Sequence, residues 1–126
     1  MNRLAVVNGV VNTMTDEDFK YGDLDCCLFA ALVAQDISGH DYAAEFNYDS
    51  EDEAAQIIAA HGGLEGLLTA LLGEPTTNTP RPGDTVLLDL DEPTVGVWYM
   101  RNPIVRGPKR FYEVSGSRAV RVWAID

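Results

Sequence analysis

Two adjacent cysteines are the residues of this 126-residue chain best suited to do chemistry. Cys26 and Cys27 follow Asp25 and begin an apolar stretch that extends to Ala34. A thiol at the start of a helix feels the positive end of the helix dipole, which favours the reactive thiolate. The neighbouring carboxylate of Asp25 opposes this effect, because it disfavours a second negative charge. Cys26 is therefore the candidate nucleophile, and the alternative is that both cysteines are small core residues.

A cysteine nucleophile also needs a base, which is most often a histidine held in place by a third polar group. The chain has two histidines. His40 follows the expected cysteine helix and, at 1.5 Å rise per residue, should lie roughly 18 Å from Cys26. His61 precedes Gly62 at the end of another expected helix, where capping or packing is the favoured interpretation. The sequence therefore places neither histidine beside the cysteine.

The remaining polar clusters predict no metal site and no cofactor. Two adjacent cysteines with two distant histidines match no zinc spacing, and a disulfide between neighbouring residues would be strained. The acidic runs 16–18 and 51–53 lack the alternating ligands and the glycine bend of a calcium loop, so we expect solvated surfaces there. The glycines form no phosphate-binding spacing.

The elements that must position the cysteine fall into two halves. Apolar spacing of three and four residues predicts helices over 2–14, 26–37, 51–61 and 64–72. Asp25 and Ser50 are the expected N-caps, Gly39 is an expected left-handed C-cap, and Gly62-Gly63 should stop the third helix. The helix that begins near Cys26 is apolar on nearly all sides, which predicts that it lies in the core.

From Asp84 the apolar period changes to two, which is typical of strands. We expect strands over 84–90, 95–100, 111–114 and 119–125, about four in all, and loops over 42–48, 74–82 and 101–110. Helices followed by strands indicate an α+β fold, with N-terminal helices packed on a small C-terminal antiparallel sheet. The length predicts a single domain over 1–126, helical over about 1–74 and β over about 84–126.

The net charge of −11 is unevenly distributed. Residues 1–100 contribute −15 and residues 101–126 contribute +4. Strong acidity argues against a nucleic-acid partner, which needs a basic surface. No stretch is long and apolar enough for a membrane helix, and the N-terminus lacks a clear signal-peptide cleavage site. We therefore expect synthesis in a cytoplasm and no membrane partner, and the uneven charge could orient the protein in an assembly.

Three motifs in order resemble those of the NlpC-type peptidases of the papain-like superfamily. Residues 21–26 (YGDLDC) followed by an apolar helix resemble the segment that carries the peptidase cysteine. Residues 82–88 (PGDTVLL) resemble the PGDLVFF strand, and residues 94–98 (TVGVW) resemble the HVGIY strand. The resemblance implies an NlpC-like fold, in which the helix that carries Cys26 packs against an antiparallel sheet.

A narrower resemblance covers most of the chain. Small proteins from phage and prophage tail gene clusters, in an uncharacterised family, share the matching residues Tyr21-Gly22, Asp25-Cys26, Leu28-Phe29-Ala30-Ala31, Gly39-His40-Asp41, Gly62-Gly63, Gly83-Asp84, Gly96-Val97 and Val122-Trp123-Ala124-Ile125. It implies a component of a phage tail, near the distal hub or tip, with other tail proteins as partners and the virion as its location.

The peptidase motif is incomplete, because Thr94 stands where the peptidases have their catalytic histidine. No Asn, Gln or His in 104–126 supplies the third polar group. The leading hypothesis is therefore a structural tail protein on a degenerate peptidase fold. The alternative is an active cysteine peptidase or amidase that cleaves peptidoglycan stem peptides, with Cys26 as nucleophile and His40 or His61 reaching it by an unexpected path. A small acidic binding or inhibitor protein is the last possibility.

Overall fold

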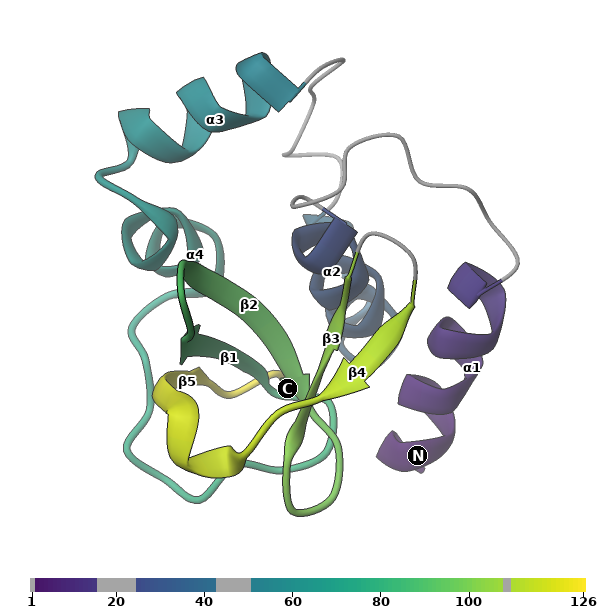
Figure 1. The fold of residues 1–126 in the computed structure, drawn as a ribbon. Coiled ribbons are helices and arrows are strands. Elements are labelled where there is room, and N and C mark those ends of the chain that lie inside the picture. Colours follow the sequence, from purple (N-terminus) through teal and green to yellow (C-terminus); the bar gives the residue numbers. More distant parts are fainter. Residues whose placement is uncertain (1, 16–24, 43–50, 108–109) are drawn as a thin grey trace.

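Helices occupy the first half of the described chain and strands the second half (Figure 1). The computed structural model describes residues 2–15, 25–42, 51–107 and 110–126. The helices are α1 (Arg3–Thr15), α2 (Asp25–Ser38), α3 (Glu51–Ala60) and α4 (Leu64–Leu72). The strands are β1 (Thr85–Asp89), β2 (Pro93–Trp98), β3 (Pro103–Arg106), β4 (Phe111–Glu113) and β5 (Ala119–Trp123), with a short 3₁₀ helix, η3 (Gly116–Arg118), before β5. The predicted α+β class is confirmed.

Helix α2 is the buried central helix that its sequence predicted. Phe29 and Val33 are fully buried, and Ala30 and Ala34 are nearly so. Its apolar residues contact α1 on one side and the strands β2 and β3 on another. Helix α1 packs on α2 through Val7, Val10 and Met14, which are the spaced apolar residues of its own sequence.

Glycines end the helices where the sequence placed them. Gly39 has φ of 82° and donates its N–H to the carbonyl of Gln35 at 2.8 Å, as expected of a left-handed C-cap. Gly62 and Gly63 follow α3 with φ of 81° and 110°, a region that L side chains rarely adopt. The side chain of Asp25, the predicted cap of α2, lies outside the described side chains. Ser50, the predicted cap of α3, and residues 43–48 of the predicted loop lie outside the described residues.

The strands form one antiparallel sheet in the order β4-β3-β2-β1-β5. The β1–β2 register places Thr85 opposite Val97 and Leu88 opposite Thr94. Strand β5 returns to pair with the other side of β1, with a register shift between Leu87 and Leu88. One hydrophobic core joins α1, α2, α4 and the sheet.

Two strand predictions are wrong. Strand β3 lies within 101–110, which the sequence analysis treated as a loop, so the described sheet has five strands rather than about four. Its four residues begin at a proline and are too few to show an alternating pattern. Strand β2 begins at Pro93, which pairs with Asp89, and ends at Trp98, because the N–H of Tyr99 turns to the carbonyl of Asn102.

The two faces of the sheet pack against different parts of the protein. Thr85 lines an apolar crevice together with Cys27 and the alanines of α2, so its side chain lies on the face that α2 covers. By the register and the alternation of the strands, Leu87, Val95 and Val97 lie on the same face. The far face carries the alternate residues Val86, Leu88, Thr94 and Gly96. Side chains of neighbouring strands fill the far face, since a Cβ at Gly96 would lie 2.9 Å from the Cδ1 of Leu88.

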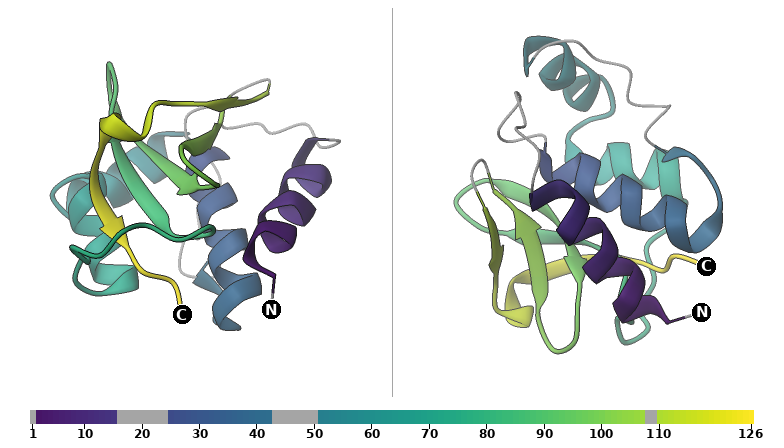
Figure 2. Two further views of the ribbon diagram at one scale, coloured as in Figure 1. Left: turned by 90° about the horizontal axis from the view of Figure 1, so that it is seen from below. Right: turned by 90° about the vertical axis from the view of Figure 1, so that its right-hand side faces the viewer.

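Helix α3 is the least integrated of the described helices. Among the described elements its main contacts are with α4, and the right-hand view of Figure 2 shows it standing away from α1 and from the sheet. The imidazole Nδ1 of His61 lies 2.8 Å from the carbonyl oxygen of Ile57, as expected of a side chain that caps or packs at this helix end.

Candidate functional site

The N-terminal end of α2 is the candidate site, because α2 begins at Asp25 and so holds the backbone of Cys26 in its first turn. The first backbone N–H groups of a helix have no partner within the helix and point outward, which is the arrangement that an oxyanion requires. The backbone of Asp25 and Cys26 belongs to the described part of the structure, whereas their side chains do not. The position of Cys26 along the fold therefore agrees with the sequence prediction.

The neighbouring Cys27 is a core residue. It is 5% exposed and lines a narrow apolar crevice between α2 and α4, together with Ala30, Ala31 and Leu68. The free volume of this crevice is about 270 Å³, open solvent included. The crevice wall is almost entirely apolar, so Cys27 has the surroundings of a small hydrophobic residue.

A buried arginine lies on the strands that face this end of α2. Arg106 is 4% exposed, and its guanidinium carbon lies 5.2 Å from the centroid of the Phe111 ring. The Phe111 ring in turn meets the ring of Phe29 of α2 edge to face, with centroids 4.8 Å apart. Arg106 Nη1 donates to the carbonyl of Gly107 at 2.7 Å. Among the described residues of β3, the charged group in this region is thus the Arg106 guanidinium, which cannot accept a proton at neutral pH.

Thr94 lies on the far face of the sheet. Its register partner is Leu88, whereas Thr85 and Val97 mark the face that α2 covers. Its hydroxyl donates to the carbonyl of Glu92 at 2.9 Å and so stabilises the turn between β1 and β2. A side chain at this position therefore points away from the helix that carries Cys26.

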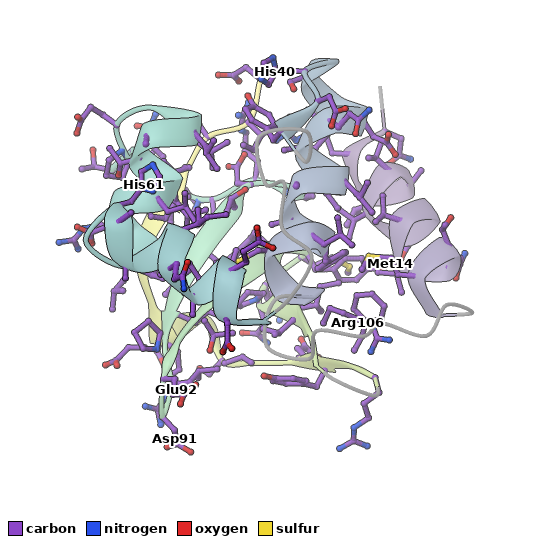
Figure 3. The ribbon with its side chains drawn as sticks, turned by 90° about the horizontal axis from the view of Figure 1, so that it is seen from above. Met14, His40, His61, Asp91, Glu92 and Arg106 are labelled. Atoms are coloured by element: carbon purple, nitrogen blue, oxygen red, sulfur yellow. The ribbon has the colours of Figure 1, made fainter. Side chains whose placement is uncertain are left out.

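Both histidines are distant from the first turn of α2. His40 follows the last turn of α2, and its ring packs against Tyr42 with centroids 4.5 Å apart. Fourteen residues of helix separate the two ends by roughly 20 Å. Figure 3 shows His40 and Arg106 at opposite ends of α2, and His61 lies directly after α3. The structure therefore agrees with the expectation that neither histidine lies beside the cysteine.

The residue pattern alone did not predict the buried carboxylate of Asp84. Asp84 is 1% exposed and accepts from the Nη2 of Arg3 at 2.9 Å, the N–H of Arg81 at 2.8 Å and the N–H of Ile125 at 3.0 Å. Arg81 also pairs with Asp126 at 2.9 Å. The hydrogen bond that Arg81 donates to the Asp126 carboxylate, and the nearby negative charge of Asp84, raise the pKa of Arg81. Asp84 was singled out beforehand only by the two motif resemblances, within residues 82–88 and as the pair Gly83-Asp84.

The contacts of Asp84 hold three segments of the chain together. Its carboxylate joins the start of α1, the turn before β1 and the C-terminal residues, and its acceptor positions are filled by chain donors. Within the described ranges, no three His, Cys, Asp or Glu side chains are grouped so as to hold a metal ion. None of the helices described is long and apolar enough to cross a membrane.

Comparison with known proteins gives a family and no function. No curated protein and no solved structure matches the chain. The family model for a domain of unknown function, DUF6950, matches residues 2–125, nearly the whole chain. The chain therefore belongs to the DUF6950 family.

Proposed function

We propose that this protein is a structural component of a bacteriophage tail, in the distal hub or tip region, built on an NlpC-like fold without peptidase activity. The observation that carries the loss of activity is the placement of Thr94. The residue at the histidine position of the motif cannot act as a base, and its side chain is directed to the far face of the sheet.

The remaining groups near α2 support the same proposal. The candidate nucleophile sits at the first turn of a buried helix, as in a cysteine peptidase, but the polar group on the adjacent strands is Arg106. A nucleophile without a base reacts only through its own thiolate fraction, which is small for an ordinary thiol at neutral pH. We therefore expect no efficient turnover at this site.

The fold part of the proposal is supported by the order of the elements. A buried helix that begins with Asp25-Cys26 packs on an antiparallel sheet, and the PGD turn leads into the first strand of that sheet. The tail part is supported by the narrower motif resemblance and by the uneven charge, with −15 on residues 1–100 and +4 on residues 101–126.

The test of the tail role is to detect the chain in purified phage tails by mass spectrometry and to measure its binding to each tail protein of its phage. We expect the chain in tails and a specific complex with at least one hub or tip protein. A chain that is absent from tails and binds none of these proteins contradicts the proposed role.

The active peptidase is the second candidate, because α2 supplies both a cysteine in its first turn and outward-pointing backbone N–H groups. Its test is cleavage of cell-wall fragments by the wild type, with Cys26→Ser as the inactive variant and Cys27→Ser as the matched control. We expect no cleavage by any of the three. Turnover that disappears only in Cys26→Ser establishes the peptidase instead.

The alkylation rate of Cys26 against pH tests the same point without a substrate, with the two cysteines resolved by mass spectrometry. We expect a rate that still rises at high pH, as for an unassisted thiol. A rate that reaches its plateau well below the ordinary thiol pKa of about 8.5 indicates an activated thiolate and favours the peptidase.

A further inference from the structure

A groove between α1 and α2, the two helices that pack against each other in Figure 2, is large enough to hold a small ligand. It is lined by Gly9, Val10 and Thr13 of α1 and by Leu32 and Asp36 of α2. Its volume is about 140 Å³. An apolar cavity of roughly 150 Å³ in another protein holds a molecule as large as benzene, so the size of the groove admits a short aliphatic chain.

The spacing of the lining residues explains why the groove is open. Gly9 and Thr13 are four residues apart in α1, and Leu32 and Asp36 are four residues apart in α2, so each pair lies along one side of its helix. A Cβ placed on Gly9 meets nothing within 4 Å. The α1 side of the groove therefore stays open because Gly9 has no side chain to fill it.

Asp36 brings a negative charge to a groove whose other walls are mainly apolar. Its side chain is exposed, and it forms no ion pair with any residue in the described parts of the chain. The hydroxyl of Thr13 donates to the carbonyl of Gly9 at 3.0 Å, so its oxygen is left to accept from a ligand. The five lining residues thus offer a ligand apolar surface and hydrogen-bond acceptors.

We propose that this groove binds a primary alkylammonium group, the chemical group that ends a lysine side chain. An ammonium has three donors and no acceptor, which matches the acceptor oxygens of Asp36 and Thr13. Its slender aliphatic chain can lie along Val10 and Leu32, where each CH₂ group removed from water adds to the affinity. The net charge of −11 raises the local concentration of cations around the protein.

A metal ion fits the groove less well than an alkylammonium. Asp36 is the one carboxylate among the five lining residues, and hard cations such as calcium take several oxygen ligands. Apolar walls also contribute nothing to the binding of a bare ion. The site lies ten residues along α2 from Cys26, which corresponds to roughly 15 Å of helix. The proposal therefore does not rest on the proposed tail function or on the chemistry of the cysteine.

The test is a titration of the full chain with n-butylammonium chloride, followed by backbone amide chemical shifts at a constant ionic strength of about 0.15 M. We expect saturable shifts at Thr13, Leu32 and Asp36, with a Kd on the order of 10 mM. Methylammonium, which lacks most of the aliphatic chain, should bind at least about fivefold more weakly.

Two variants separate the charge of the groove from its space. Asp36→Asn should weaken the binding of butylammonium about two- to fivefold, because it removes an exposed ion pair. Gly9→Leu should abolish the saturable shifts, because a larger side chain at this position occupies the open space of the groove. Asp52→Asn is the matched control, since Asp52 is an exposed aspartate of α3 outside the groove and should leave the Kd unchanged.

Two further ligands distinguish the sources of the ammonium group. Nα-acetyl-lysine N-methylamide presents the lysine side chain as a protein does, and the diamine cadaverine is a free amine. Binding of the capped lysine at least as tight as that of butylammonium assigns the groove to lysine side chains of proteins, and exclusion of the capped lysine with binding of the diamine assigns it to free amines. Both results support the site. The absence of saturable shifts with all of these ligands, unchanged binding in Gly9→Leu, or an equal loss in Asp36→Asn and Asp52→Asn overturns the proposal.

Discussion

Replacing Asp84 by asparagine should destabilise the protein strongly although the residue is remote from α2's first turn. The side chain is 1% exposed and its two oxygens accept from two backbone N–H groups and from the Arg3 guanidinium. Asparagine keeps the size of the side chain but replaces one acceptor oxygen by an NH₂ group. That NH₂ must face a donor, because donors surround the carboxylate.

The expected cost follows from these contacts. A buried N–H that loses its acceptor costs about 1–3 kcal/mol, and removal of one charge from a buried ion pair costs about 3–5 kcal/mol. Arg3 and Arg81 are 20% and 46% exposed at their side chains, so both guanidinium groups can regain water and the cost falls toward the lower end. We expect Asp84→Asn to lower the free energy of unfolding by about 2–4 kcal/mol.

Urea denaturation followed by circular dichroism measures this change. Asp36→Asn is the matched control, because Asp36 is an exposed aspartate of α2 and should change stability by less than about 0.5 kcal/mol. In a double-mutant cycle, Arg3→Met should cost less in the Asp84→Asn background than in the wild type. An Asp84→Asn variant within about 0.5 kcal/mol of wild type, or additive effects in the cycle, refutes the role assigned to this carboxylate.

Two further predictions concern packing and use the same denaturation assay. Gly66→Ala should destabilise the protein by about 1–3 kcal/mol although alanine favours helices, because the new Cβ meets the backbone carbonyl of His61 at the α3–α4 turn. Gly9→Ala in α1 is its matched control and should stabilise by about 0.5–1 kcal/mol, since nothing lies within 4 Å of the added carbon, and equal effects at both glycines contradict the argument. Trp123→Phe should cost about 1–3 kcal/mol, because it removes a fully buried indole whose Nε1 donates to the carbonyl of Gly73 at 3.1 Å, and a neutral result excludes that bond as a stabilising contact.

Local sequence patterns determined the helices and the strands that carry clear periodicity. The apolar spacing of α1 and α2, the glycines after α2, α3 and α4, and the alternation in β1 each reflect forces that act within a few residues. Strand β3 escaped prediction because four residues that begin with Pro103 show no period, and its strand character depends on pairing with β2 and β4. Short strands are defined by their neighbours rather than by their own residues.

Some features of the candidate site were also predictable from local sequence, and others were not. The position of Cys26 at the start of a buried helix, and the distance of His40 from it, follow from helix geometry and were available from the sequence. Which face of the sheet Thr94 occupies depends on the register of β1 with β2, and the burial of Arg106 and Asp84 depends on contacts between segments far apart in the chain. Only the tertiary structure decides such features, because a polar side chain is satisfied by partners that local sequence does not specify.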